Sequence, residues 1–223
     1  MNPGMIYTYG DPKAENILIQ MVDDHDLEVI EQEVSYIREL VQEKTFCLTA
    51  VKVQSWNTDL SPWAAPAVFG SEGFGGGASG TLAFLKEELI PRLGGAACAV
   101  ERKLYIGGYS LAGLFALWAA YQTDLFSGAA AASPSVWFPS FTDYMRNNPI
   151  HTDAVYLSLG DREEKTKNPV MSRVGDAIRE GYVILQNAGC DCILEWNRGN
   201  HFKEPDLRTA KAFAWLLKNQ LKK

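Results

Sequence analysis

One serine in this sequence has the neighbours of an activated nucleophile. Ser110 lies in the run GYSLAG (108–113), between a strand-like run at 103–107 and an apolar run at 111–121. A strand, a tight turn and a helix in this order form a nucleophile elbow, which exposes the serine hydroxyl at the start of the helix. Gly108 supplies the small residue needed two positions before the serine, although Ala112 stands where a second glycine is usual. This context favours nucleophilic attack by Ser110 over the alternative, a serine that only caps a helix.

A serine hydroxyl becomes a good nucleophile when a base takes its proton, and histidine suits that role near neutral pH. The chain has three histidines: His25, His151 and His201. A carboxylate in turn orients the histidine and stabilises its protonated form. The loop at 161–164 contains three carboxylates: Asp161, Glu163 and Glu164. On residue types alone, these three stay alternatives for the acid.

The elements that must position these residues alternate along the chain. Short apolar runs typical of strands occur at 17–22, 46–53, 103–107, 127–132, 154–160 and 190–196. Helical patterns occur at 27–41, 78–93, 111–121, 170–187 and from Pro205 onward. Because parallel strands need crossovers, this alternation predicts a three-layer α/β fold with a mostly parallel sheet and helices on both faces. We expect one domain over residues 1–223, with the active site beyond the carboxyl ends of the strands.

Two connections between the predicted elements bear on how the active site is covered. The stretch at 56–77 is long, irregular and rich in proline, glycine and aromatic residues. Loops of that length in a compact domain usually carry function or cover a site. The segments between 132 and 154 are short, which predicts little or no cap over the cleft.

The order of these elements, with the runs at 108–113 and 199–201 (GNH), resembles the α/β-hydrolase fold. More narrowly, the chain resembles an esterase family that includes esterase D-like, feruloyl and siderophore-esterase members. Three further runs are similar to that family: NTDLSPW (57–63), LKEELIP (85–91) and SPSVW (133–137). The resemblance covers nearly the whole chain.

The resemblance implies a catalytic triad in the chain order serine, acid, histidine. His201 follows the last strand-like run and takes the place of the base, whereas His25 and His151 are expected bystanders. The family places the acid about three residues past the glycine that ends the preceding strand, which makes it Glu163. Asp161 is the second choice and Glu164 the third, and some members of the family use only a serine–histidine pair.

An oxyanion formed on the substrate needs two backbone N–H donors. The first is expected from Leu111, directly after the nucleophile. The second is expected from the loop after the 17–22 run, from Asp23, Asp24 or His25, although this loop lacks the HGGG run of many lipases. Side chains that follow strands at the same edge of the sheet are expected to shape the substrate pocket: Trp56, Asn57 and Trp137.

Composition argues against several other classes of protein. The chain has 223 residues, of which 47% are hydrophobic and 22% charged, and its formal net charge is −6, so nucleic acid and anionic membrane are not expected partners. The longest uncharged apolar stretch, 111–121, is too short for a membrane span, and no secretion signal is visible, which predicts a cytoplasmic location. The four cysteines, at 47, 98, 190 and 192, are expected to be free thiols. With no phosphate loop or metal-ligand spacing, we expect neither an organic cofactor nor a metal.

These observations predict a serine esterase that cleaves small-molecule carboxylic esters. Two alternatives use the same fold: a catalytically idle binding module, and an acyltransferase with the same triad. The sequence leaves the identity of the ester and the oligomeric state open.

Overall fold

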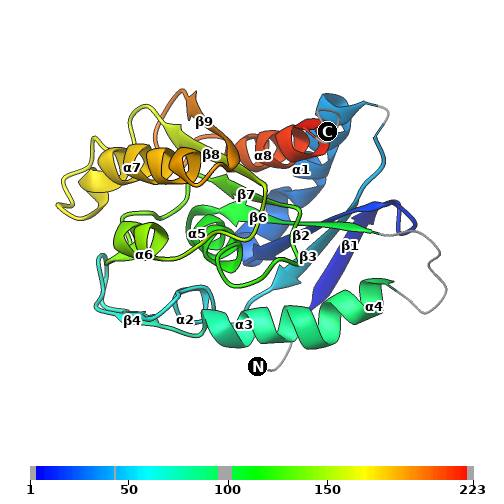
Figure 1. Ribbon diagram of the computed structural model, residues 1–223, viewed down its shortest axis with the longest axis horizontal. Helices are drawn as coiled ribbons and strands as arrows, with labels where there is room; N and C mark the ends of the chain where they lie inside the picture. The colour runs from blue at the N-terminus through cyan, green and yellow to red at the C-terminus, as the bar shows by residue number, and fades with distance from the viewer. Residues whose placement is uncertain (1–3, 43, 95–101, 220–223) are drawn as a thin grey trace.

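A computed structural model describes residues 4–42, 44–94 and 102–219 of the chain. Its centre is a seven-stranded sheet in the order β1-β3-β2-β6-β7-β8-β9 (Figure 1). The strands are β1 (Ile6–Gly10), β2 (Asn16–Val22), β3 (Cys47–Lys52), β6 (Lys103–Tyr109), β7 (Gly128–Ala132), β8 (Ala154–Gly160) and β9 (Asp191–Asn197). Neighbouring strands are parallel except at one edge, where β1 pairs antiparallel with β3. The predicted α/β class with a mostly parallel sheet is therefore confirmed.

Helices cover both faces of this sheet. On one face α1 (Asp24–Val41) packs against α8 (Pro205–Asn219), and Figure 1 shows the two helices side by side. The other face carries α5 (Ser110–Ala119), α6 (Phe141–Asn147), α7 (Val174–Asn187) and a longer helical segment. That segment consists of α3 (Ala78–Phe84), a π-helical stretch (Leu85–Leu89) and α4 (Ile90–Gly94).

Strand β2 shows why helices must cover both faces of the sheet. All seven of its residues are buried. Ile17, Ile19 and Met21 belong to the hydrophobic cluster around α5, whereas Leu18 and Val22 belong to the cluster around α1 and α8. Because successive side chains of a strand point to opposite faces, a strand with apolar residues on both faces is buried only between two layers of helices.

Some elements were not expected from the sequence. Strand β1 was missed because it is an edge strand whose residues alternate between exposed and half-buried, so it contains no apolar run. The irregular stretch at 56–77 contains a short helix α2 (Trp56–Asp59) and a two-stranded antiparallel ladder of β4 (Ala64–Ala65) and β5 (Phe74–Gly75). Helix α6 occupies part of the connection between β7 and β8.

The pairing of β8 with β9 determines which loops meet. Gly160, the last residue of β8, is in register with Asn197, the last residue of β9. Because the two strands are parallel, the loop that begins at Asp161 and the loop that begins at Arg198 leave the sheet at the same edge. Strand β6 also ends there, at Tyr109, so three segments with candidate catalytic residues come together.

The cysteines within the described part of the chain are free thiols: Cys47, Cys190 and Cys192. Burial raises the pKa of Cys47, and burial together with neighbouring ionisable groups raises the pKa of Cys190 to about 12. A raised pKa makes a thiolate scarce at neutral pH, so these cysteines are poor nucleophiles. Cys98, the fourth cysteine, lies outside the described residues.

Candidate active site

Ser110 lies at the sharp turn between β6 and α5. Its φ is +57°, in the left-handed region that non-glycine residues rarely adopt, as the nucleophile elbow requires. The strand and the helix approach closely: a Cβ added to Gly108 would lie 2.6 Å from the Cβ of Ala112. The methyl group of Ala112, which departs from the usual second glycine, is accommodated because position 108 has no side chain.

His201 lies between Ser110 and Glu163. Its Nε2 is 3.0 Å from Ser110 Oγ, and its Nδ1 is 2.7 Å from Glu163 Oε2. A proton on Nδ1 that is donated to the carboxylate leaves Nε2 as an acceptor for the serine hydroxyl. The arrangement can therefore remove a proton from Ser110 and hold it on the imidazole.

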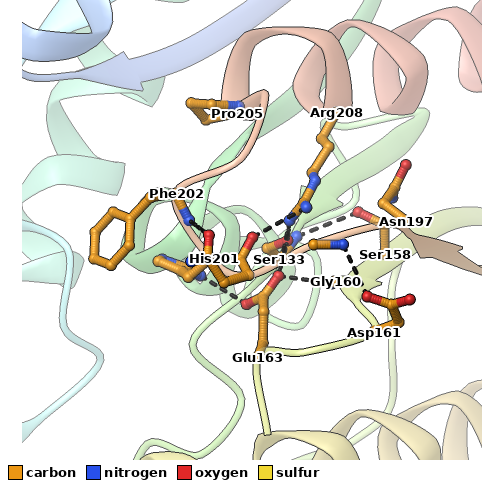
Figure 2. A network of polar contacts seen from close by, with 12 residues as sticks. Ser133, Ser158, Gly160, Asp161, Glu163, Asn197, His201, Phe202, Pro205 and Arg208 are labelled. Carbon is orange, nitrogen blue, oxygen red and sulfur yellow. Dashed lines mark hydrogen bonds and ion pairs between the residues drawn. The ribbon is translucent and has the colours of Figure 1, made fainter. Parts of the chain in front are cut away.

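Glu163 is 8% exposed and is bound by several donors (Figure 2). Its Oε1 accepts hydrogen bonds from the backbone N–H of Gly160 at 2.7 Å, from Ser133 Oγ at 2.8 Å and from Arg208 Nη1 at 2.9 Å. Burial acts to raise the pKa of Glu163, but the hydrogen bond and charge of His201, with the hydrogen bonds from Gly160 and Ser133, bring it below its ordinary value. The carboxyl group is therefore ionised at neutral pH and available to orient His201.

The other ionisable candidates have different partners. Asp161 Oδ1 accepts the backbone N–H of Gly199 at 2.8 Å, and Glu164 forms an ion pair with Arg179 at 3.3 Å. The side chain of His25 is 79% exposed and lies 3.6 Å from Glu28. His151 lines a hollow at the amino ends of β6, β8 and β9, at the opposite edge of the sheet from Ser110.

A cavity of about 390 Å³ opens beside Ser110 and His201. The three side chains expected to shape a substrate pocket, Trp56, Asn57 and Trp137, all line it. The sequence analysis missed five more lining residues: Phe69, Phe74, Ser135, Met171 and Phe202. Two of them, Phe69 and Phe74, belong to the long aromatic-rich stretch, whose composition was the available signal.

The wall of this cavity is largely aromatic. The ring of Trp137 packs edge-on against Phe69 and Phe74, with centroid distances of 6.4 and 6.1 Å. The only polar side chains that line the cavity within the described residues are those of Asn57, Ser110, Ser135 and His201. Such a wall suits an uncharged, apolar group attached to the reacting carbonyl.

The expected oxyanion donors lie in two places. Leu111 lines the cavity directly after Ser110. Asp23 is the N-cap of α1, and Asp24 and His25 belong to its first turn, where backbone N–H groups lack intrahelical partners. The side chain of Asp24 pairs with Lys52 Nζ at 2.5 Å. Asp23 and Asp24 line a separate hollow that shares Trp56 with the cavity.

The described residues contain neither a membrane-spanning helix nor a metal-binding cluster. Among the helices there, none combines the length and apolar character needed to cross a membrane. Within the same residues, no three His, Cys, Asp or Glu side chains are grouped so that they could hold a metal ion.

Comparisons with known proteins identify the family of the chain. Residues 40–182 match the model of the family described as "Putative esterase". No curated protein sequence matches the chain.

Solved structures share the fold at low sequence identity. Siderophore hydrolase EstA from Aspergillus nidulans is 19% identical, with a TM-score of 0.71 over 96% of this chain and 89% of that chain. An IroE-like serine hydrolase from Shewanella oneidensis is 15% identical, with a TM-score of 0.76 over 96% and 75%. The enterobactin esterase FES from Shigella flexneri, solved with enterobactin, is 15% identical, with a TM-score of 0.68 over 96% and 55%. By the match over residues 40–182, the chain belongs to the family described as "Putative esterase". It is a carboxylic ester hydrolase with the α/β-hydrolase fold.

Proposed function

We propose that this protein hydrolyses small-molecule carboxylic esters through an acyl-enzyme on Ser110, with His201 as the base and Glu163 as the acid. The observation that carries the proposal is the pair of contacts of His201, 3.0 Å to Ser110 Oγ and 2.7 Å to Glu163 Oε2. A serine, an imidazole and a carboxylate joined in this order act as a unit in acyl transfer.

The reaction proceeds in two halves. Ser110 Oγ attacks the acyl carbon while His201 Nε2 takes the hydroxyl proton, and the tetrahedral intermediate carries a negative charge on the former carbonyl oxygen. His201 then gives the proton to the departing alcohol. The acyl group remains bound to Ser110 as an ester. In the second half, water takes the place of the serine hydroxyl. His201 removes a proton from the water, and the hydroxide adds to the acyl carbon. The proton then returns to Ser110 Oγ as the carboxylic acid product leaves.

Backbone N–H groups are the donors for the oxyanion in this proposal. Leu111, at the start of α5, lies directly after the nucleophile and in the cavity wall. The second donor comes from the first turn of α1, from Asp24 or His25, as the α/β-hydrolase pattern implies. The acidic side chain of Asp24 does not oppose the oxyanion directly, since it pairs with Lys52.

Trp56, Asn57 and Trp137 are proposed to contact the substrate. They line the cavity of about 390 Å³ next to Ser110. The aromatic surface binds the apolar part of the ester, while Asn57, which is 9% exposed, offers an amide to a polar substituent. The cytoplasmic location expected from the sequence stays a prediction.

The proposed nucleophile is tested by labelling with a fluorophosphonate, followed by intact-mass measurement and peptide mapping. Wild type is expected to gain one adduct, on Ser110, because its hydroxyl is activated. Ser110→Ala is expected to gain none, and His201→Ala to react far more slowly. His151→Ala is the matched control, since His151 lies at the opposite edge of the sheet, and it should react at the wild-type rate.

Turnover of 4-nitrophenyl acetate and butyrate by the same four proteins completes the test. Loss of turnover in Ser110→Ala and His201→Ala, with wild-type rates in His151→Ala, is expected. Folded wild-type protein that forms no adduct and hydrolyses neither ester would overturn the proposal and favour the catalytically idle module. An adduct with transfer to an added alcohol in preference to water would favour the acyltransferase.

A further inference from the structure

Arg208 is the largest side chain in the described residues that is almost completely buried. It belongs to α8, on the opposite face of the sheet from α5, and is 1% exposed. A buried guanidinium is costly unless its donors are all met, so its partners indicate what it does. Figure 2 shows Arg208 reaching from α8 toward Glu163 and the segment that carries His201.

One nitrogen of the guanidinium binds the acid and its surroundings. Nη1 lies 2.9 Å from Glu163 Oε1, 3.0 Å from Tyr109 Oη and 3.4 Å from Ser133 Oγ. Ser133 Oγ also donates to Glu163 Oε1, at 2.8 Å. Arg208 is therefore connected to the carboxylate both directly and through Ser133.

The other nitrogen binds the loop that carries the base. Nη2 donates to the carbonyl of Asn200 at 3.1 Å and to that of Arg198 at 3.4 Å. Tyr109, which accepts from Nη1, donates in turn to the carbonyl of His201 at 2.7 Å. The guanidinium is planar and presents its donors in a fixed fork, so the positions of Glu163 and of this loop are set relative to each other.

The two oxygens of Glu163 have separate functions as a result. Oε1 accepts three hydrogen bonds, from Gly160, Ser133 and Arg208. Within the described residues, Oε2 has one hydrogen-bond partner, the Nδ1 of His201 at 2.7 Å. A carboxylate held by three donors on one oxygen has no freedom to rotate, and its second oxygen therefore faces the imidazole.

We propose that Arg208 is a positioning residue for the acid–base pair: it holds Glu163 and the 198–201 loop in the one relation that directs His201 Nε2 at Ser110. This inference rests on the triad proposed above. Arg208 does not line the cavity beside Ser110, so it acts through Glu163 and His201 and not on the substrate.

The fork and the charge of Arg208 have separable consequences. Loss of the fork lets the loop and the carboxylate shift, which lowers kcat far more than it changes KM, since Arg208 itself does not line the cavity. Loss of the charge removes a cation next to the Glu163–His201 pair. Whichever group takes the proton, the pair then binds it more tightly, so the acid limb of the kcat/KM profile moves to higher pH.

Other ionisable groups face the same pair and are unchanged in the variants below. Tyr109 approaches from β6. The loop after β8 contributes Arg162 and Lys165, which line a hollow with Glu163 and His201. A shift of the acid limb in a variant of position 208 therefore reports the charge at that position.

The experiment compares wild type with Arg208→Met, Arg208→Lys and Lys211→Met. Lys211 is the matched control, because it is a cation of the same helix that pairs with Glu195 at 2.7 Å, outside the network. Each protein is assayed for kcat and KM on 4-nitrophenyl butyrate across pH, for its rate of fluorophosphonate labelling and for thermal unfolding.

Arg208→Met is expected to lose roughly 10- to 100-fold in kcat, as misplaced catalytic groups do, with KM within about 2-fold of wild type and an acid limb at higher pH. Arg208→Lys keeps the charge and loses the fork, so kcat falls while the acid limb stays near its wild-type position. Lys211→Met should match wild type in kcat and pH profile. If Arg208→Met does not fold, the kcat of Arg208→Lys tests the inference, since a fall in kcat is expected there as well.

Two results would overturn the inference. One is a kcat within about 3-fold of wild type in the folded Arg208 variants, which is no more than the loss of one ordinary hydrogen bond would cause. The other is a fall in the activity of Arg208→Met that is no larger than the fall in the amount of folded protein, together with an acid limb at the wild-type pH. That result would show a purely structural role. These failures differ from failure of the triad, in which wild type itself would take no label on Ser110.

Discussion

The hydroxyl of Tyr109 donates a hydrogen bond to the backbone carbonyl of His201 over 2.7 Å. Tyr109 directly precedes Ser110, so the residue before the proposed nucleophile holds the main chain of the proposed base. The rings of Tyr109 and His201 also lie against each other, with centroids 5.1 Å apart. Burial, followed by the negative charge of Glu163, raises the pKa of Tyr109 to about 12, so its hydroxyl stays protonated and able to donate.

Tyr109→Phe should therefore weaken catalysis without a change in the substrate cavity. We expect kcat to fall roughly 3- to 10-fold, the range of one neutral hydrogen bond, with KM unchanged. Steady-state kinetics on 4-nitrophenyl butyrate measures this. Tyr121→Phe is the matched control, because the buried hydroxyl of Tyr121 has no hydrogen-bond partner in the described residues, and its kcat should equal that of wild type. Equal losses in both variants would argue against a role for the 2.7 Å contact.

The choice of acid can be tested by a pair of amide substitutions. Glu163→Gln should lower kcat roughly 10²- to 10⁴-fold, since the neutral amide cannot stabilise protonated His201. Asp161→Asn should stay within about 3-fold of wild type, because the carboxylate of Asp161 accepts from the Gly199 N–H and an amide oxygen can do the same. The opposite ranking of the two variants would make Asp161 the acid.

The lowered pKa of Glu163 also predicts the pH dependence of stability. Its folded-state pKa lies below the ordinary value, so the ionised carboxylate favours the folded state. This contribution is complete above the ordinary pKa and is lost as the pH falls through the folded value. Urea unfolding of wild type should therefore show a loss of stability with acid that is smaller in Glu163→Gln. A slope against pH that is identical in the two proteins would contradict the lowered pKa.

Asp26, in the first turn of α1, should have the opposite effect. Burial, and then the charge of Asp23, raises its pKa to about 6. The folded state holds this proton more tightly than the unfolded state, so the contribution of Asp26 to stability falls as the pH rises from about 4 to about 6. Asp26→Asn should thus raise the free energy of unfolding at pH 7 by roughly 1 to 2 kcal/mol.

Urea unfolding at pH 4, 5, 6 and 7 measures that effect. Asn can still accept the Asp23 N–H that Asp26 accepts at 3.1 Å, so the helix cap is kept. Asp24→Asn is the control: Asp24 belongs to the same turn, and its exposed side chain pairs with Lys52. We expect that change to stay within about 0.5 kcal/mol, as for other surface ion pairs. A destabilised Asp26→Asn protein at pH 7 would contradict the sign argued for Asp26.

The elbow itself can be tested with one methyl group. Gly108→Ala would place its Cβ 2.6 Å from that of Ala112, so strand and helix must separate. We expect a loss of roughly 1 to 3 kcal/mol in stability and a fall in kcat, because Ser110 shifts with the turn. Gly80→Ala provides the contrast: within α3 its Cβ meets nothing within 4 Å, so stability should rise by roughly 0.5 to 1 kcal/mol. Thermal unfolding and ester turnover measure both, and wild-type behaviour of Gly108→Ala would refute the close approach.

Most of the sheet was predictable because its strands are buried on both faces. The run 17–22 is apolar except for Gln20, and only a covered strand or a buried helix removes so much apolar surface from water. The edge strand β1 was not predictable in the same way, since one side of it meets solvent and its residues alternate. The ladder of β4 and β5 has only two residues in each strand, too few to leave a periodic pattern.

The sequence by itself determined that Ser110 would lie in a strand-to-helix turn and that His201 would follow the last strand. Both follow from local order along the chain, since parallel strands deliver their carboxyl ends to one edge of the sheet. Only the tertiary structure decided which carboxylate contacts His201: Glu163 does so, whereas the nearby Asp161 binds Gly199. The contact of Arg208 with Glu163 was likewise decided by the packing of α8, because contacts between residues 45 positions apart leave no local pattern in the sequence.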